Sequence, residues 1–181
     1  NIDKFIDIGL QKKISKKNEV NNSDIKFYKS PEPNEILKSK AEMHWFSYYK
    51  KWIPQENYYY AFKNTGFRPN PEGRSSGTYT KYSSLDDMCD GIHWYQAYSK
   101  FGMGRASRDA QQDIRMNHIT RDEGVRLVKK YDHEIPLRDL NFFLKYVDIS
   151  SEYFWEVINN YKKISNVWKK INNKWILKYL P

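Results

Sequence analysis

Apolar side chains recur every three or four positions through most of the second half of the chain, which predicts a series of amphipathic helices. Leu85, Met88, Ile92 and Tyr95 follow this spacing, so we expect a helix that begins at Ser84 and ends before Gly102. Four further helices are expected to start near these residues: Gly104, Thr120, Pro136 and Ser150. Thr120 with Glu123 three positions later forms the pattern of a capping box.

The first half of the chain has a weaker pattern. Residues 5–14 predict a short element, and the aromatic run over residues 43–52 predicts a strand. Pro54 suits the first turn of a helix that should stop near Gly66. Residues 67–82 hold two prolines and two glycines and predict a long loop, and Asn172–Asn173 predicts a hairpin turn near the C-terminus.

Composition adds an aromatic share of 17% and a formal net charge of +9. The aromatic side chains are sufficient to build a core, and the positive charge favours anionic partners. Much of that charge comes from lysines near the two ends, which are typical of a solvated surface. The single cysteine, Cys89, allows no disulfide within the chain and fits a cytoplasmic location. No apolar run approaches the ~20 residues of a membrane span, and the histidines show no metal-binding spacing.

The most informative short motif is Gly102-Met103-Gly104-Arg105, directly before a predicted helix. Glycines let the backbone turn and approach a ligand, and a helix N-terminus favours an anion. Arg105 could add a bidentate contact to a phosphate. A flexible turn with an Arg105–Asp109 pair at helical spacing explains the same residues equally well.

Two other segments carry residue types that suit a sugar or an anion. The loop over residues 77–82 combines small, hydroxyl-bearing and basic side chains, and Asp86, Asp87 and Asp90 follow it. Residues 52–60 place glutamine and glutamate among aromatic rings. A plain surface loop and an aromatic core helix are the corresponding structural explanations.

Three strings in this order resemble the C-terminal half of N-acetyl sugar amidotransferases, a family of the PP-loop ATP pyrophosphatase superfamily. They read WIPQENYYYAFKNTGF from residue 52, GTYTKYSSLDD from residue 77 and KFGMGRASRDAQQDIRMNHITRDEGVRLVKKYD from residue 100. The resemblance extends over roughly residues 44–160. Several linked motifs make it more specific than any one of them.

The resemblance implies a mainly α fold: the C-terminal helical region of an α/β adenine-nucleotide hydrolase-like enzyme, with a little β structure at the two ends. Residues 1–52 would be the end of the α/β ATP-pyrophosphatase core, and residues 53–181 the helical region that shapes the substrate site. The implied reaction converts a sugar acetamido group to an acetamidino group in the biosynthesis of bacterial surface glycans, such as lipopolysaccharide or flagellar sugars.

Cofactors and partners follow from the same resemblance. ATP with Mg would activate the amide oxygen as an adenylate, and ammonia supplied by glutaminase and cyclase-like subunits would then displace AMP. The substrate would be an N-acetyl sugar linked to a nucleotide or a lipid, and the enzyme could form a homo-oligomer. The superfamily's SGGxDS phosphate loop does not occur in these 181 residues, so ATP would be bound mainly by a part of the enzyme N-terminal to them.

Lys81 and Arg105 are the predicted catalytic residues, because stabilising the charge of an activated amide needs preorganised cationic donors. We expect these two side chains to converge on one pocket. The predicted substrate-binding residues are Trp52, Gln55, Glu56, Tyr79, Asp86, Asp87, Asp109 and Arg115.

Two alternatives to the enzyme remain open at this level. Basic residues interleaved with tyrosine and tryptophan can bind single-stranded nucleic acid, although no signature of a known nucleic-acid-binding module is present. A non-catalytic interaction module would explain the missing phosphate loop.

The missing loop generates the first testable prediction. The purified 181-residue chain should neither hydrolyse ATP nor release pyrophosphate, because its sequence lacks a phosphate-cradling loop. A pyrophosphate-release assay with the N-acetyl sugar substrate and ammonia present measures this. ATP consumption above that of a blank preparation would contradict it.

Overall fold

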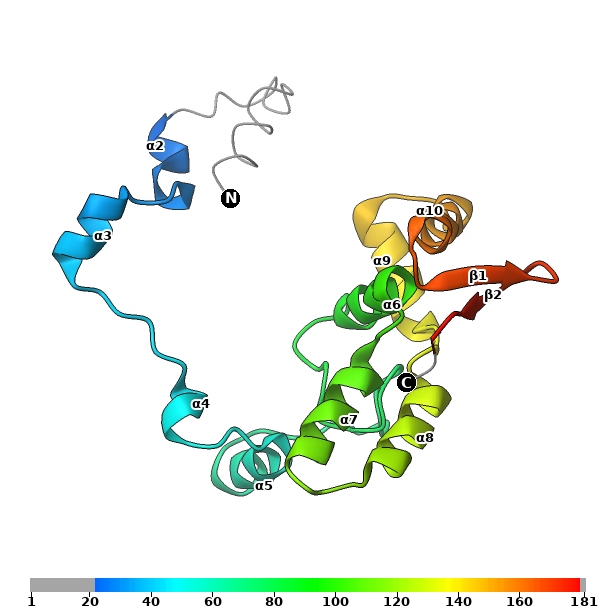
Figure 1. Cartoon of the computed structure of the whole chain (residues 1–181), viewed down its shortest axis with the longest axis horizontal. Helices are drawn as coiled ribbons and strands as arrows, with labels where there is room; N and C mark the ends of the chain where they lie inside the picture. Colours follow the sequence, from blue (N-terminus) through cyan, green and yellow to red (C-terminus); the bar gives the residue numbers. More distant parts are fainter. Residues whose placement is uncertain (1–21, 180–181) are drawn as a thin grey trace. The chain divides into compact units, whose positions relative to one another are not determined.

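The computed structural model describes residues 22–179 and divides the chain into two compact units, residues 1–51 and residues 52–181. Figure 1 shows the chain coloured along its sequence. The second unit contains six helices, α5 to α10, and one hairpin. The prediction of a mainly helical chain is therefore confirmed, and of the β structure predicted at both ends, the described residues 22–179 contain only the C-terminal hairpin.

Short helices make up the described part of the first unit: α2 (Asn22–Ile25), the 3-10 helix η1 (Lys26–Tyr28), α3 (Pro33–Ser39) and α4 (Phe46–Tyr49). Proline in the first turn of α3 and the capping pair Glu32 and Glu35 explain where that helix begins. The element expected over residues 5–14 lies outside the described residues. The assignment of residues 1–52 to an α/β core stays a prediction.

The strand predicted over residues 43–52 is wrong, because α4 occupies its centre. Aromatic residues favour a strand only where a neighbouring strand can pair with it. Residues 22–51 contain no strand that could do so. The rings of Trp45, Phe46 and Tyr48 are largely exposed, so the run does not form a buried face either.

Helix α5 (Pro54–Asn64) begins at Pro54 and is capped by Thr65, one residue before the predicted end near Gly66. The next helix, α6, spans Asp90–Phe101 rather than starting at Ser84. Ser84 has a positive φ of 58°, and the Asp87 side chain accepts a hydrogen bond from the Cys89 backbone N–H at 2.6 Å. This local bond stabilises a turn in place of a helical start.

The remaining helices follow their predicted caps: α7 (Arg105–Arg115), α8 (Arg121–Tyr131), α9 (Leu137–Val147) and α10 (Ser151–Ile164). The Thr120–Glu123 capping box at the start of α8 is present, and the Ser150 hydroxyl accepts from the Tyr153 backbone at the start of α10. Strands β1 (Trp168–Ile171) and β2 (Lys174–Leu177) are antiparallel, with Trp168 opposite Leu177. Asn172 and Asn173 both have positive φ, as the predicted tight turn requires.

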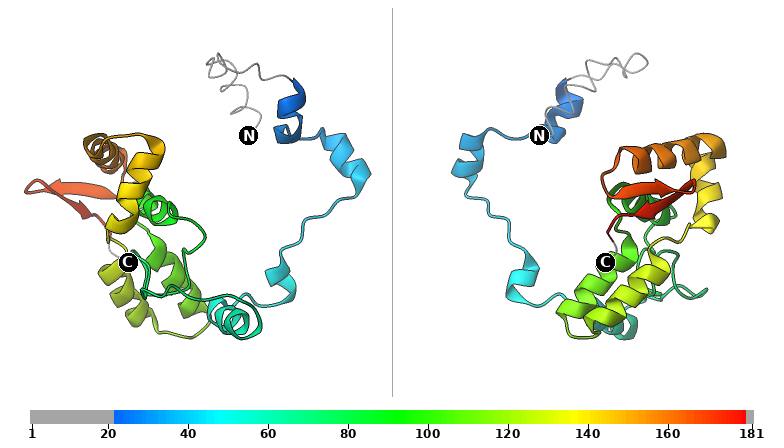
Figure 2. Two further views of the ribbon diagram at one scale, coloured as in Figure 1. Left: turned by 180° about the vertical axis from the view of Figure 1, so that it is seen from behind. Right: turned by 45° about the vertical axis from the view of Figure 1, so that its right-hand side comes forward.

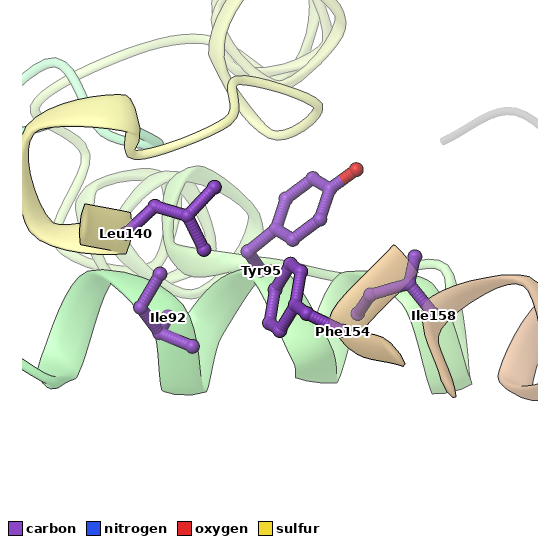
Figure 3. Close-up of a cluster of buried hydrophobic side chains, with 5 residues drawn as sticks. All are labelled: Ile92, Tyr95, Leu140, Phe154 and Ile158. Carbon is purple, nitrogen blue, oxygen red and sulfur yellow. The ribbon is translucent and has the colours of Figure 1, made fainter. Parts of the chain in front are cut away.

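The core of the second unit lies between α6, α9 and α10 (Figure 3). Ile92 and Tyr95 of α6 contact Leu140 of α9 and Phe154 and Ile158 of α10. The hairpin packs beside α6 and α10 (Figure 2). It is held by Trp168, whose indole N–H donates to the Ser99 carbonyl at 2.8 Å. Helices α7 and α8 form a second packed pair, joined to α6 through α7.

This core generates the second prediction. Phe154→Ala should lower the free energy of unfolding by about 3–5 kcal/mol, because Phe154 is only 2% exposed and its loss leaves a cavity. Tyr153→Ala is the matched control on the same helix and should cost less than about 1 kcal/mol, because Tyr153 is 55% exposed. Urea unfolding measures both. Equal losses of unfolding free energy in the two variants would contradict this position of the core.

Candidate functional site

A cavity of about 770 Å³ lies within the second unit, within the range of roughly 300–1,000 Å³ typical of small-molecule sites. We call it the α7 cavity. Its lining comes from four places: α5 with Trp52 and Phe67 on either side of it, Thr80 with residues 82–86, the first turns of α6, and one face of α7. Segments far apart in sequence thus meet around one space.

Helix α7 contributes the charged wall of this cavity. Arg105, Arg108, Asp109, Gln112 and Asp113 all line it, and their spacing of three and four residues puts them on one side of the helix. Ala106 and Ala110 on another side are buried against the rest of the fold. Packing of these alanines therefore fixes which polar side chains face the cavity.

Two arginines share one aromatic ring in the cavity. The guanidinium groups of Arg105 and Arg108 lie 5.1 Å and 5.5 Å from the centre of the Trp94 ring, within cation–π range. Arg105 also donates to the Asp109 carboxylate at 3.1 Å, and Thr78 donates to the other oxygen of that carboxylate at 2.6 Å. Arg105 is therefore held from two sides before any ligand binds.

Tyrosine side chains form much of the opposite wall. Tyr82 stacks on Tyr58 with ring centres 4.7 Å apart and donates to the side-chain oxygen of Gln55 at 3.1 Å. Tyr79 donates to Asp113 at 2.7 Å. Burial raises the pKa of Tyr82 to about 12, and burial with the hydrogen bond to Asp113 raises that of Tyr79 further. Both phenols therefore remain protonated and can act as hydrogen-bond donors at neutral pH.

Three buried polar atoms among the lining residues have no hydrogen-bond partner: Thr80 Oγ1, Ser84 Oγ and Trp94 Nε1. Thr80 is only 8% exposed. Buried polar groups in native proteins are almost always paired, because an unpaired one costs about 1–3 kcal/mol. Because these three atoms have almost no solvent-accessible area, they lie behind the surface of the cavity rather than on it.

The N-terminus of α7 is not free for an anion, contrary to one interpretation of the glycine motif. The Asp132 carboxylate accepts from the backbone N–H groups of Gly104 at 2.9 Å and Ser107 at 3.0 Å. The N–H of Ala106 donates to the Gly77 carbonyl at 2.9 Å. A Cβ at Gly104 would lie 2.9 Å from the Asp132 carboxylate, so this glycine makes room for the protein's own acidic cap.

The structure brings four of the predicted site residues into the α7 cavity: Trp52, Asp86, Arg105 and Asp109. Gln55 and Tyr79 lie one hydrogen bond away, through Tyr82 and Asp113.

Four predicted residues lie elsewhere. Lys81 and Glu56 are exposed and do not line the cavity, so the structure does not bring Lys81 into one pocket with Arg105. Asp87 lines a separate space of about 550 Å³ beside Arg68 and Arg138. Arg115 lines a groove on another side of α7.

Sequence reasoning missed Arg108, Trp94 and Asp113. Arg108, Gln112 and Asp113 continue the spacing that starts at Arg105, so a helical projection of residues 105–113 would have found them. Trp94 gave no such signal, because only the packing of α6 against α7 places its ring under the arginines.

Comparison with known proteins identifies a family for this chain. Residues 76–180 match the family model described as LPS biosynthesis protein WbpG-like, C-terminal domain, where LPS is lipopolysaccharide. A search of curated proteins gives no match. Among residues 22–179, no helix has the length and apolar character needed to cross a membrane.

Asp109 generates the third prediction. Burial raises its pKa above the ordinary value of 3.8, and the Arg105 ion pair and the Thr78 hydrogen bond only partly oppose this rise. The folded chain then holds the Asp109 proton more tightly than the unfolded chain does. The stability of the wild type relative to Asp109→Asn should therefore be greatest at low pH and fall as the pH rises through the folded pKa.

Urea unfolding of both proteins at several pH values between about 3 and about 7 measures this difference. Asp122→Asn changes an exposed carboxylate of α8 and controls for the general response of the fold to pH. A wild-type advantage that grows with pH would show that the ion pair with Arg105, rather than burial, dominates.

Proposed function

Because the chain belongs to the family of lipopolysaccharide-biosynthesis proteins with a WbpG-like C-terminal domain, we propose that it is the C-terminal part of an ATP-dependent N-acetyl sugar amidotransferase. In this proposal the α7 cavity binds the N-acetyl sugar, which is linked to a nucleotide or a lipid. The reaction converts the acetamido group of that sugar to an acetamidino group.

One observation carries the proposal: Arg105 and Arg108 lie over the Trp94 ring, in a cavity whose lining also includes the polar side chains of Asn57 and Gln112. Guanidinium groups bind phosphate with two parallel hydrogen bonds. The side-chain amides of Asn57 and Gln112 are suited to sugar hydroxyl and amide groups. A phosphorylated sugar needs both kinds of contact within one space.

The side chains of this chain would orient the substrate and stabilise charge during the reaction. Arg105 is preorganised by Asp109, so it can donate to a developing negative charge without rearranging. Among the acidic lining residues, Asp86 and Asp90 are available to accept from sugar hydroxyls. Tyr82 lines the space, and Tyr79 lies behind it and donates to Asp113, and both phenols keep their protons at neutral pH.

ATP supplies the activation of the amide oxygen in the proposed reaction. The residues of this chain do not fit its triphosphate, because Asp132 and Gly77 occupy the N–H groups at the start of α7. We therefore place ATP and Mg on another part of the enzyme. Ammonia would come from glutaminase and cyclase-like subunits.

The nucleic-acid alternative has less support from the cavity. Its lining includes four aspartates, Asp86, Asp90, Asp109 and Asp113, which would repel a continuous phosphate backbone.

The fourth prediction tests the cavity with UDP-N-acetylglucosamine as the probe. Arg108→Ala should weaken its binding to the chain by roughly 10- to 100-fold, since a charge-assisted hydrogen bond contributes about 1.5–3 kcal/mol. Arg126→Ala removes an exposed arginine of α8 that does not line the cavity, and it should leave binding unchanged. Isothermal titration calorimetry measures both.

A second variant separates the sugar from the phosphate. Gln112→Leu keeps the approximate size of a lining side chain and removes its amide, so it should weaken the binding of UDP-N-acetylglucosamine more than that of UDP. The absence of any binding by the wild-type chain, or equal effects of Arg108→Ala and Arg126→Ala, would refute the cavity as the sugar site.

A further inference from the structure

A second hollow lies along α7 and α8 and has a different character from the α7 cavity. It has a volume of about 830 Å³, and we call it the α7–α8 groove. Its floor includes Ala110 and Gly124, where the two helices pack so closely that a Cβ at Gly124 would lie 2.7 Å from Ile114. Small residues at this contact leave an open channel between the larger side chains on either side.

The walls of the groove are apolar and partly open to solvent. Phe101 is 62% exposed and Met103 is 61% exposed, and Val125 of α8 and Leu177 of β2 lie nearby in the same lining. Aromatic residues, methionine and arginine are enriched where proteins bind one another. Large exposed apolar patches on soluble proteins usually mark binding surfaces.

The charged residues around this groove have a single sign. Arg108, Arg115 and Arg121 line it, and none of its described lining residues is acidic. This differs from the α7 cavity, which mixes arginines with aspartates. A partner that fits must therefore present apolar side chains toward the floor and negative charge toward the rim.

The length of the groove indicates the form of that partner. Its α7 side runs from Ser107 to Arg115 and its α8 side from Arg121 to Val128, which is about 10–12 Å at 1.5 Å per residue. An amphipathic helix with apolar anchors at positions i, i+3 or i+4, and i+7 spans roughly the same distance.

We propose that the α7–α8 groove docks an acidic amphipathic helix of a partner protein. A second copy of this chain fits poorly, because its net charge is +9 and two arginine rims would face each other. Electrostatic complementarity of this kind selects the partner and speeds its association.

Docking in this groove would reach the α7 cavity, because Trp94 and Arg108 line both spaces. A partner that binds Arg108 from the groove would either draw its guanidinium away from the cavity or hold it in place there. The docking claim itself does not depend on the proposed sugar amidotransferase function.

The test uses the 181-residue chain and a synthetic 18-residue helical peptide with leucines at the anchor positions and glutamates on its polar face. Fluorescence anisotropy should show saturable binding. A scrambled peptide of the same composition should bind at least ten-fold more weakly, and so should a peptide with lysines in place of the glutamates.

Two matched double variants locate the site on the chain. The double variant Arg115→Glu with Arg121→Glu reverses the charge at the rim of the groove and should weaken peptide binding at least ten-fold. Arg126→Glu with Lys129→Glu makes the same change in net charge on the exposed side of α8, outside the groove, and should weaken it less than two-fold. Met103→Asp should also weaken binding, and circular dichroism checks that each variant is folded.

Several results would overturn the proposal. Equal binding of the acidic and scrambled peptides, or equal effects of the two double variants, would show general charge attraction only. Dimerisation that Met103→Asp abolishes, seen by sedimentation, would assign the groove to a second copy. Binding to phosphatidylglycerol vesicles without binding to the peptide would assign it to a lipid surface. Failure of UDP-N-acetylglucosamine to bind would leave these outcomes unchanged and would bear only on the α7 cavity.

Discussion

The cap that Asp132 places on α7 is the contact on which the position of the site depends. Its carboxylate joins the residue after α8 to the backbone at the start of α7, with a further bond from the Ser107 hydroxyl. Asp132 is 5% exposed, so this charge-assisted contact is made away from solvent. It fixes the rotation and start of α7, and the charged wall of the cavity follows from that rotation.

Contacts with neighbouring side chains keep the two positive charges of the cavity in place. Arg105 and Arg108 stay close together on one helix, although their like charges repel, because the Trp94 ring and the Asp109 carboxylate lie beside them. Asp109 in turn accepts from Thr78, which belongs to the long loop over residues 65–89. The loop is therefore part of the wall that holds the arginines, and not only a connection between α5 and α6.

Helix starts with local causes could be predicted from the sequence, and features set by distant contacts could not. Thr120 with Glu123, Ser150 and Pro54 act within one turn, so their helices begin where expected. Ser84 and Asp87 offered the same local signal, but the Asp87 side chain bonds within its own turn. At the site, the polar face of α7 was partly predictable through Arg105 and Asp109. The Trp94 platform and the Asp132 cap arise from residues 11 positions before and 27 positions after Arg105, and no local pattern connects them.

The anchoring of Trp168 on α6 has a consequence for how the protein is made. This indole is 6% exposed, bonds to the Ser99 carbonyl and meets the Tyr98 ring edge-on at 5.3 Å, although 69 residues separate Trp168 from Ser99. As the ribosome extends the chain from its N-terminus, α6 emerges long before the side chains that cover it. The part of α6 around Tyr98 and Ser99 stays uncovered until residue 168 has left the exit tunnel, because its contact with Trp168 cannot form earlier.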